Sequence, residues 1–309
     1  MSVSHRNDFL WSGRQDFEDG AQARRLHDLM GEKGQRALLG FACDAGVIRN
    51  KGRAGAAHAP DQIRKALTNL SATGGPSALT DLGTIQIEND ALEAGQTHMS
   101  IKLDKELRQY ERIIVLGGGH ETAFGSYSGL KLHYPDAHIG IINLDAHLDL
   151  RKPGDSGPSS GTPFYQMREA FPKKFDYLCL GAAEESNTSA LFDRARQWSV
   201  GVISDKALLR DPRAADKVIR DMIARSDIIY LTIDLDVLPF YQMPGVSAPA
   251  ARGVPLATIE RLIGFVLEGC DAAGKKLPLA DIVELNPVYD QDNMSAKTAA
   301  LIARQLLLS

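Results

Sequence analysis

The chain of 309 residues is 44% hydrophobic and carries a formal net charge of −4 at pH 7. This content is enough to bury a full core, and the lack of a basic stripe argues against nucleic acid as the main partner. No apolar run approaches the roughly 18–20 residues of a transmembrane helix, the first ten residues lack a signal-peptide pattern, and the three cysteines are scattered. We therefore expect a cytoplasmic protein that binds neither nucleic acid nor membrane.

Strand and helix patterns alternate along the chain after a polar N-terminal arm, residues 1–34, with helical character near 21–30. Strands are predicted at 36–43, 79–87, 112–116, 138–144, 177–180, 200–203, 228–235 and 279–285. Helices are predicted at 60–70, 91–110, 122–133, 162–171, 189–198, 211–225, 256–270 and 292–308. The alternation predicts an α/β fold with a mostly parallel sheet and helices on both faces. No linker or repeat divides the chain, so we expect 1–309 to be one domain.

The stretch N-L-D-A-H-L-D-L-R follows the predicted strand at 138–144. Asp145, His147 and Asp149 sit at alternate positions, so they project to one side if the backbone stays extended. Two carboxylates and an imidazole are costly to bury unless something pairs with them. A divalent cation is the natural partner. The alternative is a solvated strand end in which Arg151 forms a structural salt bridge.

Two other predicted strands lead to the same residue types. The strand at 228–235 ends in Asp234 and Asp236, and the strand at 112–116 leads to His120 in G-G-G-H. Ligands bind at the carboxyl ends of strands in open α/β sheets. Four aspartates and two histidines are about what two divalent ions need. This set suits Mn²⁺ better than Mg²⁺, Fe²⁺ or Zn²⁺. The alternative is three coincidental clusters.

Charged residues elsewhere on the same rim favour an anionic substrate. The glycine-rich loop after the first strand carries Arg49, Lys51 and Arg53, although a solvated loop is the preferred interpretation for Lys51. Glu284 lies inside the apolar pattern at 279–285. A buried glutamate there is either paired structurally or used to bind a substrate.

The motifs G-G-G-H, N-L-D-A-H-L-D-L-R and T-I-D-L-D-V-L-P, in this order and at these separations, resemble the ureohydrolase (arginase/agmatinase) superfamily over essentially the whole chain. The resemblance implies a three-layer α/β/α domain with about eight strands. Two metal ions about 3.5–4 Å apart can share a water, and the resulting hydroxide attacks an amidine or guanidine carbon. The resemblance implies two Mn²⁺ ions per chain, one held by His120, Asp145, Asp149 and Asp234, and the other by Asp145, His147, Asp234 and Asp236.

Other features resemble the formimidoylglutamase branch of this superfamily. They are W-x-G-R-x-D and R-R-L-H in the arm and P-G-V-S-A-P at 244–249. Arginases and agmatinases carry His-Gly where this chain has Ser160-Gly161, and the D-x-D motif continues here to Leu238-Pro239 instead of Asp-Pro. The implied reaction is hydrolysis of N-formimidoyl-L-glutamate to L-glutamate and formamide, in histidine degradation. The alternatives are another ureohydrolase acting on a guanidino acid or agmatine, and an inactive metal-binding scaffold.

The resemblance also assigns roles within the site. Glu284 would hold the amidine-like head through two parallel hydrogen bonds, and either Asp149 or the bridging carboxylates would relay protons. Arg53 is the first candidate for the substrate carboxylates, because its planar fork takes a carboxylate bidentately. Arg49 is the second, and Ser160 is a further candidate substrate contact. Arg151 ranks lower, since we expect it to pair with Asp149. The only partner expected is this small molecule, and homo-oligomers remain open.

Overall fold

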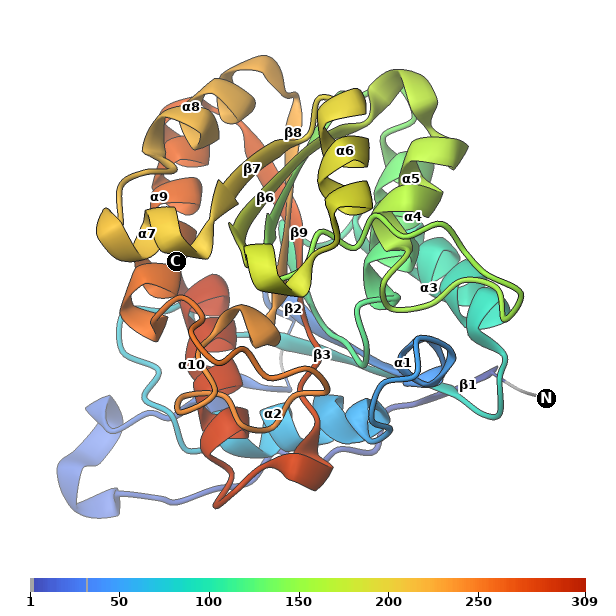
Figure 1. Ribbon diagram of the computed structural model, residues 1–309. Helices are drawn as coiled ribbons and strands as arrows, with labels where there is room; N and C mark the ends of the chain where they lie inside the picture. The colour runs from blue at the N-terminus through green and yellow to red at the C-terminus, as the bar shows by residue number, and fades with distance from the viewer. Residues whose placement is uncertain (1–2, 32) are drawn as a thin grey trace.

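The computed structural model of the protein describes residues 3–31 and 33–309. The strands are β1 Val3–Arg6, β2 Arg36–Ala42, β3 Thr80–Ile87, β4 Arg112–Leu116, β5 Ile139–Leu144, β6 Asp176–Ala182, β7 Gly201–Ser204, β8 Ile228–Asp234 and β9 Lys276–Val283. They form a sheet of nine strands in the order β1-β3-β2-β4-β9-β8-β5-β6-β7, which runs through the middle of the molecule (Figure 1). Neighbouring strands are parallel except for β1 and β3. The mostly parallel sheet is therefore confirmed, with nine strands instead of about eight.

Helices cover both faces of this sheet. They are α1 Ala45–Arg49, α2 Ala59–Leu67, α3 Leu92–Glu106, α4 Thr122–His133, α5 Pro163–Ala170, α6 Ser189–Gln197, α7 Asp205–Arg210, α8 Asp216–Arg225, α9 Leu256–Ala272 and α10 Met294–Leu308. One hydrophobic core includes residues of α2 and α7 to α10, and a second core, on the opposite face, includes residues of α3 to α6 (Figure 1). The predicted three-layer α/β/α architecture is confirmed. In the described part of the chain, no helix is long and apolar enough to cross a membrane.

The central strands are apolar on both faces because helices cover both. Every residue of β4, β5 and β8 is buried, as expected for parallel strands between two helix layers. The G-G-G-H motif follows β4, and a Cβ atom on Gly118 would lie 1.6 Å from the carbonyl oxygen of Cys43. Glycine therefore allows the loop after β4 to pass the end of β2, on its way to His120.

The N-terminal arm differs from its prediction. Its first described segment is β1, which adds an antiparallel strand to the edge of the sheet beside β3. The region expected to be helical near 21–30 contains two short 3₁₀ helices, η1 Phe17–Gln22 and η2 Leu26–Leu29. A strand of four residues is too short to give a clear alternating pattern. Residues 1–2 and 32 of the predicted arm lie outside the described residues.

Three other features of the chain differ from the predictions. The loop after β2 contains the short helix α1, and the helix expected at 211–225 begins only at Asp216, after the separate helix α7. The last strand was expected to continue to residue 285, but β9 ends at Val283. Glu284 therefore lies just beyond the carboxyl end of β9.

A buried ion pair anchors the arm to the sheet. Arg64 of α2 is fully buried, and its Nε and Nη2 atoms donate hydrogen bonds to Asp81 of β3 at 2.9 and 2.8 Å. The indole N–H of Trp11, in the arm, donates to the same carboxylate at 2.8 Å. Asp81 thus joins the arm, strand β3 and helix α2.

We predict that Asp81→Ala lowers the free energy of unfolding by about 3–5 kcal/mol, because it removes the carboxylate that accepts two hydrogen bonds from the buried Arg64 guanidinium. The remaining ion-pair partner, Asp61, lies 3.8 Å from Arg64 Nη1, too far for a hydrogen bond. The measurement is equilibrium unfolding in guanidinium chloride. Asp193→Ala is the control, because Asp193 pairs with Arg196 and both side chains are more than 60% exposed. Such surface pairs contribute about 0–1 kcal/mol. Equal losses in the two variants would contradict the prediction.

Candidate metal centre

The predicted metal-binding residues follow strands that are neighbours in the sheet. β4, β9, β8 and β5 lie side by side in that order, and they are parallel, so their carboxyl ends meet at one edge. His120 follows β4, and the motif that begins at Asp145 follows β5. Asp234 ends β8, and Asp236 lies in the following 3₁₀ helix, η6 Leu235–Val237. The sheet therefore brings together residues that are more than a hundred positions apart in the sequence.

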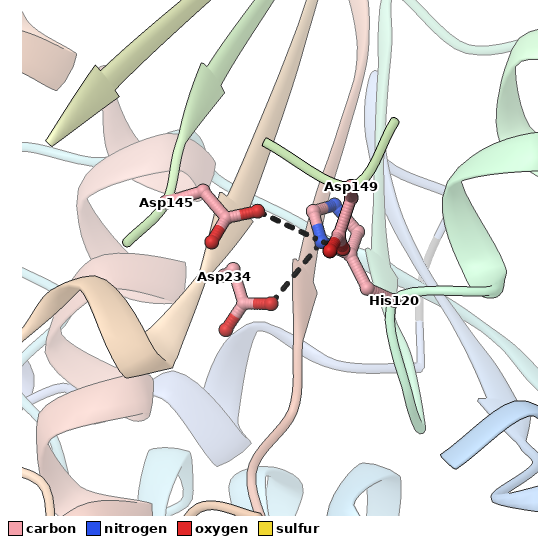
Figure 2. Close-up of side chains that lie close together, drawn as sticks. All are labelled: His120, Asp145, Asp149 and Asp234. Atoms are coloured by element: carbon pink, nitrogen blue, oxygen red, sulfur yellow. Dashed lines mark ion pairs between the residues drawn. The ribbon is translucent and has the colours of Figure 1, made fainter. Parts of the chain in front are cut away.

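Three carboxylates surround one imidazole nitrogen. The His120 Nδ1 atom lies 3.2 Å from Asp145 Oδ2, 3.0 Å from Asp149 Oδ2 and 3.1 Å from Asp234 Oδ2. Figure 2 shows the four side chains pointing toward one another from separate segments. His120 and Asp145 are fully buried. These four residues form the first group that could hold a metal ion.

A second group shares Asp145 with the first. It consists of Asp145, His147 and Asp236. The His147 Nδ1 atom lies 3.0 Å from Asp236 Oδ2 and 3.7 Å from Asp145 Oδ1. Asp234 stands beside this group, since its Oδ1 atom accepts the backbone N–H of Asp236 at 2.9 Å. The structure therefore brings all six predicted residues together.

The D-A-H-L-D motif reaches this arrangement by turning, not by extending. β5 ends at Leu144, and the Asp145 Oδ1 atom accepts the backbone N–H of His147 at 2.6 Å. Asp149 has a φ of 46°, in the left-handed region that non-glycine residues seldom adopt. The expectation that alternation would place the three side chains on one side assumed an extended backbone, and that assumption is wrong. The turn sends His147 to the second group and Asp149 to the first.

Crowded charge perturbs the ionisation of these residues. Burial and then the neighbouring Asp236 and Asp145 raise the pKa of Asp234 well above its ordinary value, and burial with Asp145 raises that of Asp149. Asp236, acting against burial, raises the pKa of His147. Protons alone do not relieve the repulsion among these carboxylates, because each proton can bridge only one pair of groups.

A divalent cation fits the geometry better than a proton does. The Nε2 atom of His120 lies 3.1 Å from Thr232 Oγ1, so the Nδ1 atom faces the three carboxylates. This Nδ1 atom has no hydrogen-bond partner in the described part of the chain, although three carboxylate oxygens lie within 3.2 Å. The Asp236 Oδ1 atom is also buried without a partner. Oxygen-rich ligation with imidazole suits Mn²⁺.

Buried polar residues that were not predicted support the ligand residues. Thr232 contacts His120, and Asn143 donates to Asp145 Oδ2 at 2.9 Å and to the Tyr177 hydroxyl at 3.0 Å. Thr232 and Asn143 each stand two positions before an aspartate of the site. That spacing is a signal the sequence contained, because residues two apart in a strand face the same side.

Glu284 faces the same space from the end of β9. Its φ is 68°, and its Oε1 atom accepts the backbone N–H of His120 at 2.8 Å. Its other carboxylate oxygen forms no hydrogen bond with the residues that the structure describes. Burial, followed by the nearby Glu121, raises the pKa of Glu284 well above its ordinary value. The side chain is thus held at one oxygen, while it lines the cavity beside the two groups.

A cavity of about 290 Å³ opens over the two groups. It is lined by Asn50, Lys51, Gly52, Arg53, His147, Asp149, Arg151, Ser160, Asn187, Leu191, Asp234, Asp236, Ser247, Ala248 and Glu284. Ser160 is buried in this wall, and its hydroxyl accepts a hydrogen bond from Asn50 at 3.2 Å. Acidic groups form one part of the lining and cations another.

Arg53 lines the cavity, as predicted. Its guanidinium donates to the backbone carbonyls of Val246 and, at 3.0 Å, Ser247, and it stacks over Tyr289. Asn286, in the E-L-N-P pattern, holds the Arg53 carbonyl at 2.8 Å. The P-G-V-S-A-P and E-L-N-P stretches therefore fix this arginine from two sides. Its Nη1 atom forms no hydrogen bond with any described residue.

The structure does not bring Arg49 to the cavity, which corrects the prediction for this residue. Helix α1 turns its guanidinium toward the start of α3, where it pairs with Asp90 and Glu93, each at 2.7 Å. It also donates to the Pro158 carbonyl at 3.1 Å. Arg49 thus ties α1 to α3 and to the loop at 152–162. The sequence did not reveal α1, so the direction of Arg49 could not be predicted.

Arg151 also differs from its prediction. Asp149 is turned toward His120, and Arg151 forms no salt bridge with it. Arg151 is exposed at the cavity wall, and its guanidinium donates to the Asn50 side chain at 3.2 Å. Lys51 lines the same wall and forms no ion pair with the described residues. Two cations without counter-ions in the described structure therefore line the same cavity as the acidic groups.

Comparison with known proteins agrees with this architecture. The model of the arginase family matches residues 35–309. This chain belongs to the arginase family. Among its relatives, formimidoylglutamase of Aeromonas salmonicida (strain A449) is 48% identical over 319 residues, covering 99% of this chain and 98% of the relative. Formimidoylglutamase of Vibrio vulnificus (strain YJ016) is 46% identical, covering 95% of this chain and 93% of the relative.

Solved structures share the fold of this arginase-family chain. A crystal structure of formimidoylglutamase from Bacillus subtilis matches with a TM-score of 0.82 at 22% identity, covering 96% of this chain and 93% of that one. A structure of Trypanosoma cruzi formiminoglutamase with Mn²⁺ matches with a TM-score of 0.79 at 25% identity, covering 92% of this chain and 97% of that one. The superfamily suggested by the three motifs is confirmed.

We predict that Mn²⁺ raises the thermal stability of the wild-type protein and that Asp145→Asn removes most of this increase. Asp145 belongs to both groups, and an ion at 100 times its dissociation constant stabilises the folded state by about 2.7 kcal/mol. Calorimetry with and without Mn²⁺ measures the change. Asp205→Asn is the matched control, because Asp205 is a buried aspartate paired with Arg252 outside both groups. A full Mn²⁺ response in Asp145→Asn would contradict the prediction.

Proposed function

We propose that this chain is a formimidoylglutamase that hydrolyses N-formimidoyl-L-glutamate to L-glutamate and formamide, in histidine degradation. Relatives of that name are 42–48% identical to it over nearly its whole length. The observation that carries the proposal is a single cavity lined both by acidic groups and by two cations, Arg151 and Lys51, that form no ion pair with the described residues. A substrate with a cationic amidine head and two carboxylates matches that distribution of charge.

We assign the six ligand residues to two Mn²⁺ ions. One would be held by the first group and the other by the second, with Asp145 in both. Asp234, which belongs to the first group and stands beside the second, would be the other residue shared by the two ions. The Trypanosoma cruzi formiminoglutamase structure with Mn²⁺ supports this choice of metal. When bound, two such ions supply water that is activated near neutral pH and positive charge opposite the developing negative charge.

The residues of the chain orient the substrate and handle its protons. Glu284 holds the amidine N–H groups, because a carboxylate matches a planar N–C–N cation. Its bond from the His120 backbone keeps the carboxylate in place. Asp149 lines the same cavity as Glu284. Its carboxylate would take up the proton released by the attacking water and pass it to the departing amine of L-glutamate.

Cations that line the same cavity bind the two carboxylates of the substrate. We place Arg151 first and Lys51 second, since neither has a counter-ion in the described structure. Arg53 contributes through its Nη1 atom, because its Nε and Nη2 atoms already donate to backbone carbonyls. Ser160 lies in the same wall and is a further contact for this end of the substrate. Arg49 is excluded from this role because it lies elsewhere.

The experiment that tests the proposal is a substrate panel with Mn²⁺-loaded protein. We expect kcat/KM to be highest for N-formimidoyl-L-glutamate and low for agmatine, whose far end has no carboxylate for the cationic wall. L-arginine is expected to react poorly, because Ser160 stands where arginases carry a histidine. Formamide and urea release are measured separately. A preference for agmatine or arginine would refute the substrate assignment, while the metal proposal would stand.

We predict that Arg151→Ala raises KM for N-formimidoyl-L-glutamate about 10–100-fold without changing Mn²⁺ content. Hydrogen bonds to charged groups contribute about 1.5–3 kcal/mol, and 1.4 kcal/mol corresponds to a tenfold change. Steady-state kinetics and metal analysis provide the two readouts. Lys152→Ala is the matched control, because Lys152 is the next residue and does not line the cavity. An unchanged KM in Arg151→Ala would exclude Arg151 from binding the substrate.

A further inference from the structure

The two histidines of the metal centre are held in different ways. The ring of His120 is fixed by Thr232, which lies 3.1 Å from its Nε2 atom. The His147 ring has no comparable support, since its Nε2 atom forms no hydrogen bond within the described part of the chain. Its direction must therefore be set by the backbone that carries it. The groups that hold this backbone therefore decide where the imidazole points.

Asn187 brackets the backbone on both sides of His147. Its Nδ2 atom donates to the Ala146 carbonyl at 2.9 Å, and its Oδ1 atom accepts the Leu148 N–H at 2.9 Å. The second N–H of the amide donates to the Ala183 carbonyl at 2.8 Å, which ties the bracket to the end of β6. Both donors of this side chain are thus used within the protein.

We propose that Asn187 is a positioning residue, which holds the backbone at 146–148 so that the His147 imidazole faces Asp145 and Asp236. The inference rests on the proposed metal centre but not on the identity of the substrate. Asn187 is 8% exposed and lines the cavity, so a direct substrate contact is the competing role. Its hydrogen bonds argue against that role, because neither amide proton is free for a ligand.

Two neighbouring side chains also hold the backbone beside His147. The Cys179 thiol lies 3.3 Å from the His147 carbonyl, and the Tyr177 hydroxyl donates to the Leu148 carbonyl at 3.1 Å. These two groups contact the carbonyls of the loop. The Leu148 N–H, by contrast, depends on Asn187. Loss of the Asn187 amide would therefore free the loop at one side of His147.

The test compares Mn²⁺ binding by Asn187→Asp, Asn187→Ala and wild-type protein. Asn187→Asp keeps the size and the acceptor for Leu148, but it places an oxygen opposite the Ala146 and Ala183 carbonyls. Losing a residue that orients a metal ligand typically costs about 10–100-fold in metal affinity. We expect a loss of this size for the ion beside His147 and a much smaller one for the ion beside His120. Calorimetric titration gives the affinities, and anomalous diffraction at the manganese edge gives the occupancy of each position.

Two further variants make the result specific. Thr232→Val removes the group that faces the His120 ring at nearly constant volume, so it should deplete the other position instead. Asn69→Asp makes the same chemical change at an asparagine whose Oδ1 atom accepts the Arg14 N–H in the arm, and it should leave both affinities unchanged. Thermal unfolding without metal shows whether each variant is folded.

Three results would overturn the inference. Equal losses at both positions in the Asn187 variants would indicate a general structural role. Unchanged Mn²⁺ binding with a raised KM would indicate a substrate contact. Wild-type protein that binds no Mn²⁺ would remove the metal centre and this inference with it. Wild-type protein that binds Mn²⁺ without hydrolysing N-formimidoyl-L-glutamate would refute only the substrate assignment, and the titrations would still decide the role of Asn187.

Discussion

Negative charge concentrated at one edge of the sheet is the constraint on which the rest of this structure depends. Four aspartates and Glu284 meet there with only two imidazoles between them. Burying charged groups costs several kcal/mol each unless counter-charge and hydrogen bonds compensate. Burial, and after it the neighbouring carboxylates, raise the pKa of Asp234 and of Glu284. Divalent cations held there would remove the conflict, so metal binding would also stabilise the fold.

The order of the strands makes such crowding feasible. β9, the last strand of the chain, lies between β4 and β8, so Glu284 arrives beside His120. Rigid parallel strands between two helix layers set the positions of the backbone, and buried polar side chains then set the directions of the ligands. Lys51 and Arg151 on the cavity wall, by contrast, lie on loops and are exposed. The floor of the cavity is therefore rigid, whereas its rim can vary without disturbing the metal centre.

The sequence predicted the parts of the structure that depend on local pattern. Parallel strands buried on both faces appear as apolar runs, and the ligand residues follow directly after them, so the fold class and the meeting of the six residues could be inferred. Strand order could not, because no local pattern states that β9 inserts between β4 and β8. The left-handed backbone at Asp149 could not be predicted either, because it is imposed by the packing of the site and not by the local sequence. The direction of Arg49 could not be predicted either, because helix α1 lies inside a glycine-rich loop.

Charge separation within the cavity has a consequence for how a substrate enters. Under the proposed function, Glu284 attracts the amidinium head and Arg151 and Lys51 attract the carboxylates, so the charges of the site favour a substrate with both groups. A ligand that is cationic at both ends meets repulsion at the rim whichever way it enters. A dicarboxylate without a cationic head meets repulsion at the floor unless metal ions neutralise it. Specificity in this molecule therefore arises as much from rejecting mismatched charge as from contacts with the preferred substrate.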